Sequence, residues 1–261
     1  MKRTSKAKAR WVVKAGSNLI CSGGPLLIRA WMNQVAELKQ THHIEIIWVS
    51  SGAIASAVDR TRFKKPKRTL AERQALSAIG QPMVMDLYNI ALQAQGLLGA
   101  QVLLTYQDLT AEPQKTNLKN TMKQLLKWGV TPILNENDTV ATEEIQFGDN
   151  DSLSARIAKT MKADRLIILT DVEGLFDSDP RKNKKAKRVE KLFGVSPSLI
   201  KRVSSSSSVG SSRGRGGMAS KLGAARLATR AGIETWLAKG DIPRVLIQIA
   251  QNQKIGTKIK A

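Results

Sequence analysis

The segment IEIIWVSSGAIASAV, residues 44–58, decides the fold class because a strand, a polar turn and a helix follow one another in it without a break. Residues 44–49 are rich in β-branched and aromatic side chains, which is typical of a buried strand. Ser50, Ser51 and Gly52 then predict a turn, and residues 53–58 predict the beginning of a helix. Parallel α/β sheets are built from this unit of strand, turn and helix.

The same order of strand, loop and helix recurs along the chain. Strands are predicted at residues 11–15, 44–49, 101–105, 130–134, 166–169 and 233–237. Helices are predicted over a segment that passes through Trp31, Val35 and Leu38, and at residues 53–58, 70–95, 116–128, 151–161 and 218–231. Gly80, Gln81 and Pro82 are expected to interrupt the third helix, residues 172–217 to be mostly loop, and residues 245–249 to form a last short strand or helix. The alternation predicts an α/β protein with parallel pairing and right-handed crossovers.

Composition limits the class of protein. With 261 residues and 42% hydrophobic content the chain can bury a large core. We expect a basic tail at residues 1–9 and a single domain over residues 10–261. The longest apolar runs are much shorter than the ~20 residues that cross a bilayer, and the N-terminus does not read as a signal peptide, so a soluble cytoplasmic protein is expected. One cysteine, Cys21, and two adjacent histidines disfavour disulfide and zinc chemistry.

The charge allows two interpretations. Forty-two Lys and Arg against 21 Asp and Glu give a net charge of +21, which would attract nucleic acid or small anions. The basic residues are nevertheless scattered, aromatic residues make up only 4% of the chain, and no nucleic-acid module is evident. The composition therefore favours a solvated basic surface over an RNA-binding protein.

Polar residues follow several of the predicted strands, at the sheet edge where ligands of open α/β sheets bind. They are Lys14 and Gly16, Ser50 to Gly52, residues 135–138, and Thr170 with Asp171. A glycine between a strand and a helix can bring main-chain N–H groups and a helix N-terminus to an anion, although it can equally be an ordinary turn. These segments are the candidate site.

Two lysines suggest phosphoryl transfer. Lys14 ends an apolar strand, and Lys221 falls in the first turns of a predicted helix, where a cation is unfavourable unless an anion binds nearby. They could flank a phosphoryl group, with Asp151 holding both, while Asp138 and Asn150 bind the ammonium and carboxylate of an amino acid. The alternative is that Asp149 or Asn150 only caps a helix and that residues 135–138 only make a turn.

Several motifs together resemble the glutamate 5-kinase branch of the amino acid kinase family. They are VVKAG at 12–16, VSSGAIA at 49–55, IGQ at 79–81, NENDTVAT at 135–142, FGDNDSLSA at 147–155, LTDVEGLF at 169–176 and GRGGMASK at 214–221. The resemblance covers residues 10–257, and the pair NEND and GDND is its most specific part. It implies a three-layer αβα sandwich with a central, mostly parallel sheet, which is a carbamate kinase-like fold.

The resemblance implies transfer of the γ-phosphoryl group of ATP to the side-chain carboxylate of L-glutamate, the first step of proline biosynthesis. Lys14, Asp151 and Lys221 would be catalytic, and Ser51, Gly52, Asp138 and Asn150 would bind glutamate. The residues implied for ATP are Lys14, Gly16, Thr170, Asp171, Arg215, Gly216, Gly217, Met218, Ala219, Ser220 and Lys221. Mg²⁺ would be bridged by the phosphates of ATP, with no ligand assigned to the protein. A carboxylate acceptor is ionised at neutral pH and needs no general base.

The chain departs from the family pattern in three places. The first loop reads KAGSN instead of KLGTS, and GTGGM has become GRGGM. We also expect no C-terminal PUA domain of the kind common in the family, because the sequence ends at Ala261. The resemblance also implies a homo-oligomer, a dimer or tetramer, with proline as a possible feedback inhibitor. Two rival functions stay open: another phosphotransferase of the family, and a degenerate kinase fold used as a basic RNA-binding module.

Overall fold

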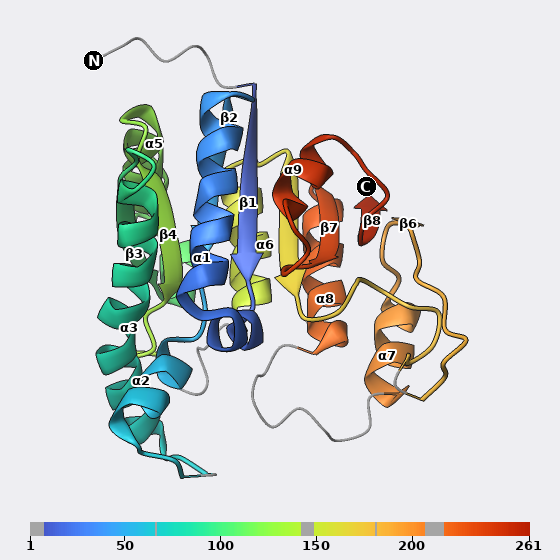
Figure 1. Cartoon of the computed structure of the whole chain (residues 1–261), viewed down its shortest axis with the longest axis horizontal. Coiled ribbons are helices and arrows are strands. Elements are labelled where there is room, and N and C mark those ends of the chain that lie inside the picture. Colours follow the sequence, from blue (N-terminus) through green and yellow to red (C-terminus); the bar gives the residue numbers. More distant parts are fainter. Residues whose placement is uncertain (1–7, 66, 142–148, 181, 207–216) are drawn as a thin grey trace.

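One mixed sheet forms the centre of the molecule (Figure 1). The computed structural model describes residues 8–65, 67–141, 149–180, 182–206 and 217–261. The strands are β1 Ala9–Ala15, β2 Ile44–Val49, β3 Gly99–Leu104, β4 Thr131–Glu136, β5 Arg165–Thr170, β6 Lys191–Phe193, β7 Glu234–Lys239 and β8 Thr257–Lys260. The helices are α1 Ser17–Gln40, α2 Ala53–Thr61, α3 Leu70–Gln93, α4 Tyr106–Thr110, α5 Gln114–Lys127, α6 Asn150–Thr160, α7 Pro197–Ser206, α8 Met218–Thr229 and α9 Val245–Ala250.

Within the described ranges the strands follow the order β3-β4-β2-β1-β5-β7-β8-β6. All recorded strand pairs are parallel except β7 with β8, which is antiparallel. The chain leaves β1 toward β2 through α1 and returns to the other side of β1 at β5. Because β2 and β5 lie on opposite sides of β1, the strand order reverses at β1. A ligand is therefore expected at the carboxyl ends of β1 and β5.

Helices cover both faces of the sheet, and the sheet separates the hydrophobic core into two parts. On one face, Val13 and Trp48 pack with buried side chains of α1, α3 and α9. On the other face, Val12 and Ile47 pack with side chains of α4, α5, α6 and α8. Neighbouring residues on one strand point to opposite faces, which explains why these strands are apolar throughout instead of alternating. The three-layer αβα arrangement agrees with the predicted fold class.

The predicted interruption of the third helix is wrong, because α3 continues through Pro82. Proline removes one main-chain hydrogen bond and normally kinks a helix. Buried contacts of Leu76, Val84 and Tyr88 on either side stabilise α3, and a capping box at Thr69 fixes its first turn.

The prediction of loop over residues 172–217 is also incomplete, because β6 and α7 lie in it. Residues 245–249 lie in a helix, α9, and β8 follows it with no strand predicted there. These elements are short, and β6 has only one strand neighbour, β8, so the sequence carried little periodicity to reveal them. Helix α4 was not predicted either, whereas the order of strands and helices in the other segments agrees with the structure.

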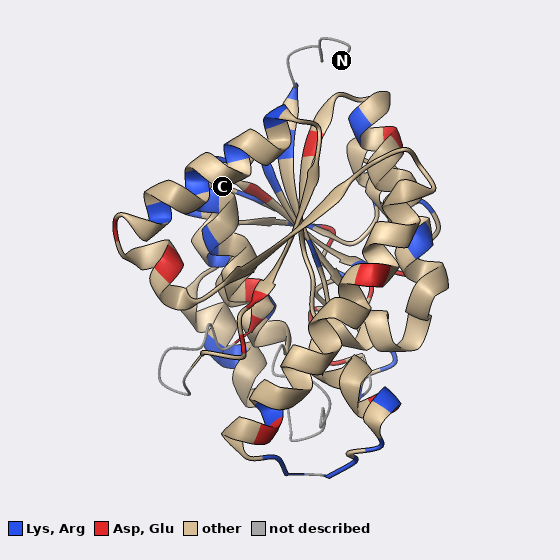
Figure 2. Ribbon diagram, turned by 90° about the vertical axis from the view of Figure 1, so that its left-hand side faces the viewer, with Lys and Arg blue, Asp and Glu red and all other residues tan. Residues whose placement is uncertain are grey.

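Lys and Arg residues are distributed over several helices on both sides of the sheet (Figure 2). Of the predicted basic tail, residues 1–7 lie outside the described residues. None of the helices described is both long enough and apolar enough to span a membrane.

Candidate active site

The predicted site residues that the structure describes lie at or after the carboxyl ends of four neighbouring strands, β4, β2, β1 and β5, and at the starts of α6 and α8. Lys14 and Gly16 are at the end of β1, and Thr170 ends β5. In Figure 1 the arrowheads of β1 and β5 point to this lower edge, where α6 and α8 also begin. The topology therefore gathers segments that are far apart in the sequence.

Asp151 holds both lysines. Lys14 Nζ lies 2.6 Å from Asp151 Oδ1, and Lys221 Nζ lies 3.2 Å from Asp151 Oδ2. Asp151 is completely buried, and the two lysines are exposed by only 4% and 6%. Each carboxylate oxygen thus orients one ammonium group, and an ammonium group carries three N–H donors, which suits it to phosphate oxygens.

The electrostatics of this cluster follow from burial and charge together. Burial lowers the pKa of Lys14, and the nearby charge of Lys221 lowers it further, against the opposing effect of Asp151. Burial alone would raise the pKa of Asp151, but Lys14 and Lys221 outweigh it and leave that pKa below its usual value. Asp151 is therefore ionised at neutral pH and supplies a fixed negative charge between the lysines.

Asp149 links the start of α6 to the start of α8. Its side chain accepts a hydrogen bond from the main-chain N–H of Ser152, which makes it the N-cap of α6. The hydroxyl of Ser220, one residue before Lys221, donates to the other oxygen of Asp149. Burial and the charge of Asp151 raise the pKa of Asp149. The two helices that carry Asp151 and Lys221 are thus joined at their first turns.

The predicted nucleotide side lies beside the lysines. Thr170 donates from its hydroxyl to Asp171, and Asn18 donates its amide to the same carboxylate at 3.0 Å. Gly217 is the N-cap of α8, and Met218, Ala219 and Ser220 form its first turn. Arg215 and Gly216, also predicted to bind ATP, lie outside the described residues.

The main-chain N–H of Gly16, which the sequence suggested could bind an anion, is used within the sheet instead. Its N–H donates to the carbonyl of Leu169 at 3.3 Å, so this group supports the sheet. A Cβ atom at Gly16 would lie 3.9 Å from Lys14 Nζ, which shows how closely the loop passes the lysine.

On the predicted glutamate side, Asn150 is held by β2 and β4. Its amide Nδ2 lies within hydrogen-bonding distance of the Ser50 carbonyl at 2.8 Å, Ser51 Oγ at 3.0 Å and Asn135 Oδ1 at 2.7 Å, and these three acceptors share its two N–H groups. Gly52 follows with φ +87°, a conformation that favours glycine, and caps α2. Ser51 and Asn150 are therefore brought together.

Asp138 is held from α3. It accepts a hydrogen bond from Ser77 Oγ at 2.9 Å. Three residues that support the site were given no role from the sequence, namely Asn18, Ser77 and Gln81. Asn135 was included only as part of the segment 135–138, and the link from Asp149 to α8 was not foreseen. The available indication that α3 contributes to the site was a polar residue, Gln81, between Gly80 and Pro82 in an otherwise apolar helical segment.

The described residues of the site do not form a set of protein ligands for a metal ion. Over the described ranges, no group of three or more His, Cys, Asp or Glu side chains is arranged to hold a metal ion. Asp171 is exposed, and the hydrogen bonds that it accepts from Asn18 and Thr170 lower its pKa against the opposing effect of partial desolvation, so it is an ionised oxygen donor beside the lysines. This donor set fits a Mg²⁺ ion that arrives on nucleotide phosphates.

Comparison with known proteins gives a consistent family. Residues 9–239 match the amino acid kinase family. Glutamate 5-kinase of Alcanivorax borkumensis is 41% identical over 256 residues, covering 97% of this chain and 67% of that protein. Glutamate 5-kinase of Thioalkalivibrio sulfidiphilus is 42% identical over 252 residues, covering 95% and 66%. The chain spans about two thirds of the length of these curated relatives.

Solved structures support the fold. Aspartate kinase from Synechocystis superposes with a TM-score of 0.66 at 18% identity, covering 97% of this chain and 40% of that one. Carbamate kinase from Giardia lamblia, a structure bound to AMP-PNP, gives a TM-score of 0.65 at 14% identity, covering 97% and 98%. The predicted carbamate kinase-like fold is confirmed.

Proposed function

This chain belongs to the amino acid kinase family, and on that premise we propose that it phosphorylates the side-chain carboxylate of L-glutamate with ATP. The product is L-glutamyl 5-phosphate, and the reaction is the first step of proline biosynthesis. The observation that carries the proposal is the pairing of Lys14 and Lys221 with the two oxygens of Asp151 at the point where the strand order reverses. Curated relatives named glutamate 5-kinase support the choice of acceptor.

The chemistry needs charge stabilisation and alignment more than acid or base catalysis. A glutamate carboxylate oxygen attacks the γ-phosphorus, the bond from that phosphorus to the β–γ bridging oxygen breaks, and ADP leaves with the electron pair. Because the acceptor carboxylate is already ionised, no proton is removed from it. Lys14 and Lys221 donate to oxygens of the transferring group from two sides, and Asp151 keeps both ammonium groups in place.

The substrates divide between the two sides of this cluster. Ser51, Gly52, Asp138 and Asn150 bind glutamate. ATP lies along the residues predicted for it, Gly16, Thr170, Asp171 and the start of α8, with Arg215 and Gly216 included in the proposal. When bound, Mg²⁺ neutralises charge on the ATP phosphates, and Asp171 is the described carboxylate best placed to meet it.

Three further parts of the proposal concern the whole protein. We propose that residues 10–261 act as one kinase domain, that the protein works as a homo-oligomer in the cytoplasm, and that proline can act as a feedback inhibitor. The shape of proline, an amino acid with an ammonium and a carboxylate, suits a site built for glutamate. Size measurement in solution and proline titration of the reaction test these parts.

The direct test is ATP- and Mg²⁺-dependent phosphorylation of L-glutamate, with the product trapped as the hydroxamate. Aspartate and N-acetylglutamate serve as control acceptors. Turnover on glutamate alone supports the proposal. A folded protein that binds ATP but phosphorylates no acceptor would contradict it and favour the degenerate, RNA-binding alternative, which a salt-dependent RNA-binding measurement then tests.

A further inference from the structure

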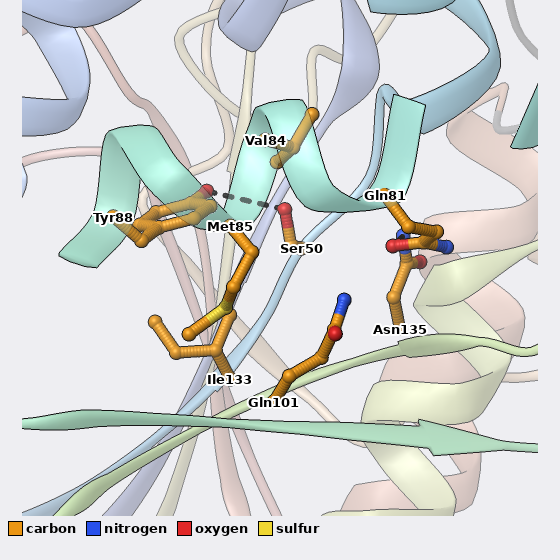
Figure 3. A pocket seen from close by; sticks show the side chains of 8 residues that line it. All are labelled: Ser50, Gln81, Val84, Met85, Tyr88, Gln101, Ile133 and Asn135. Atoms are coloured by element: carbon orange, nitrogen blue, oxygen red, sulfur yellow. Dashed lines mark hydrogen bonds between the residues drawn. The ribbon is translucent and has the colours of Figure 1, made fainter. Parts of the chain in front are cut away.

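A chain of buried amides runs behind the glutamate side of the site, from α3 to the first turn of α6. Asn150 Nδ2 donates to Asn135 Oδ1 at 2.7 Å, and Asn135 Nδ2 donates to Gln81 Oε1 at 3.1 Å. Gln81 Nε2 in turn donates to the carbonyl of Glu136 at 3.2 Å. Gln81 and Asn135 are exposed by only 7% and 5%. Figure 3 shows these two side chains next to each other.

Main-chain groups fix the direction of every bond in this chain. The N–H of Glu136 can only donate, and it donates to Asn135 Oδ1 at 3.0 Å. The carbonyls of Ser50 and Glu136 can only accept, and they receive hydrogen bonds from Asn150 and Gln81 respectively. An amide turned by 180° would place oxygen against oxygen or N–H against N–H at these positions. The NH₂ group of Asn150 is therefore committed to the protein, and its oxygen is the atom that can accept from a substrate.

A second branch leaves the same glutamine. Gln81 Nε2 also lies 3.5 Å from Ser77 Oγ, and Ser77 Oγ donates to Asp138 Oδ2 at 2.9 Å. Ser77 is completely buried and lies one turn before Gln81 on α3. One face of α3 thus supports two of the polar side chains that we assign to glutamate: Ser77 contacts Asp138 directly, and Gln81 contacts Asn150 through Asn135.

The surroundings hold this face of α3 rigidly. The pocket beside Gln81 has a volume of only ≈ 10 Å³ and is lined in part by Met85, Tyr88 and Ile133 (Figure 3). It is too small for an amino acid, so these side chains pack behind the site and do not form it. Tyr88 is buried, its hydroxyl accepts from Trp48 and Ser50, and burial raises its pKa to about 12, so it stays protonated.

We propose that Gln81 is a positioning residue of the glutamate site. Through Asn135 and Ser77 it orients Asn150 and Asp138, so that oxygen atoms of these two side chains accept hydrogen bonds from the α-ammonium group of the substrate. The inference rests on the proposed function and deepens it, because it names the substrate group that is read. A site lined by acceptors binds a free ammonium and disfavours a substrate that lacks one, since buried acceptors would then lose their donor.

The test compares Gln81→Met with wild type on L-glutamate and on glutarate, which is glutamate without the ammonium group. Methionine keeps the length and apolar packing of the side chain but cannot join the amide chain. We expect the KM for glutamate to rise about tenfold, with the preference for glutamate over glutarate falling by about the same factor. The KM for ATP is expected to stay within about twofold of wild type, since no step of this argument reaches the nucleotide side.

Two further variants separate positioning from folding. Gln34→Met removes another buried glutamine, whose Oε1 accepts from the main-chain N–H of Leu246 far from the site, and should leave the KM for glutamate unchanged. Ser77→Ala deletes one hydroxyl on α3 and should raise the KM for glutamate in the same direction as Gln81→Met, by a smaller factor.

The outcomes separate the inference from the proposed function. An unchanged KM for glutamate and unchanged preference over glutarate in a folded Gln81→Met protein would overturn the inference alone. Equal losses toward glutamate and ATP, or the same loss in Gln34→Met, would also overturn it, because they indicate general damage. A wild-type protein without turnover on glutamate would overturn the proposed function and the inference together.

Discussion

Lys14 Nζ and Asp151 Oδ1 lie 2.6 Å apart in a place where both side chains are almost completely removed from solvent. Asp151 also receives Lys221 on its second oxygen, so one carboxylate compensates two buried ammonium groups. Removing that carboxylate would leave two cations in a poorly solvated site, which is a costly arrangement. The site therefore depends on Asp151 for its structure as well as for its chemistry.

Asp151→Asn is expected to lower the free energy of unfolding by about 3–5 kcal/mol and to reduce kcat on glutamate by about 10²-fold. Asparagine is almost the same size, so the change isolates the charge. Urea denaturation and the hydroxamate assay measure the two effects. Asp86→Asn, at an exposed carboxylate on α3, is the matched control and should change neither. A stable and fully active Asp151→Asn protein would contradict the role assigned to this charge.

Lys221→Ala is expected to reduce kcat by about 10²- to 10³-fold with a smaller change in the KM for glutamate, because its ammonium acts mainly on the charge of the transferring group. Steady-state kinetics with separate titrations of ATP and glutamate give both constants. The control Lys254→Ala removes a lysine that is highly exposed and pairs only weakly with Glu190 at 3.8 Å. Wild-type turnover by Lys221→Ala would exclude a catalytic role for Lys221.

Gly80→Ala is expected to destabilise the protein by roughly 2–4 kcal/mol, because α3 and α2 touch through their main chains at this point. A Cβ atom on Gly80 would lie 1.8 Å from the carbonyl oxygen of Ala53, at the start of α2. The helices would have to separate, and Ser51 and Gly52, which lead into α2, would move with them. Thermal denaturation measures the loss.

Gly223→Ala is the matched control for this contact. Gly223 lies within α8, and nothing is within 4 Å of the position its Cβ would take. Alanine there should leave stability unchanged or raise it by about 0.5–1 kcal/mol through its higher helix propensity. Equal stability losses in the two alanine variants would show that close packing at Gly80 is not the cause.

Much of the fold could be predicted because its signals are local. Runs such as residues 44–49 and 166–169 can be completely apolar only in strands buried on both faces, and the glycine-containing turns after them indicate helices. Pro82 was misleading for the same reason, since local propensity predicts a break where packing of Leu76 and Tyr88 maintains the helix. The short β6 and β8 depend on partners distant in sequence, which no local pattern reveals.

The candidate site divides in the same way. Lys14, Asp151 and Lys221 stood out because charged residues at a strand end or a helix start need a partner, and the structure brings the three together. No role could be assigned to Gln81 and Ser77 from the sequence, because the role of a buried polar side chain depends on its hydrogen-bond partners, which the sequence does not show. Those partners lie more than fifty positions further along the chain: Glu136 accepts from Gln81, Asp138 accepts from Ser77, and Asn135 donates to Gln81.

Lys39→Met is expected to change how stability depends on pH, at the opposite edge of the sheet from the site. Lys39 Nζ donates to the carbonyl of Gly129 at 2.8 Å and to Thr131 Oγ1 at 2.7 Å, and burial lowers its pKa to about 8. In the unfolded chain the pKa is near 10.5, so between these values the unfolded state binds more protons than the folded state. Stability due to this group must therefore rise with pH across that window.

Wild type should gain stability relative to Lys39→Met as pH increases from about 8 to about 10.5, by on the order of 2–3 kcal/mol at most, while below pH 8 their difference should stay constant. Urea denaturation of both proteins at several pH values measures this difference, and subtraction removes the titration of the other lysines. If the stability of wild type relative to Lys39→Met does not change through the window, Lys39 keeps its ordinary pKa in the folded protein. If it falls with rising pH, that pKa is raised, and either result contradicts the prediction.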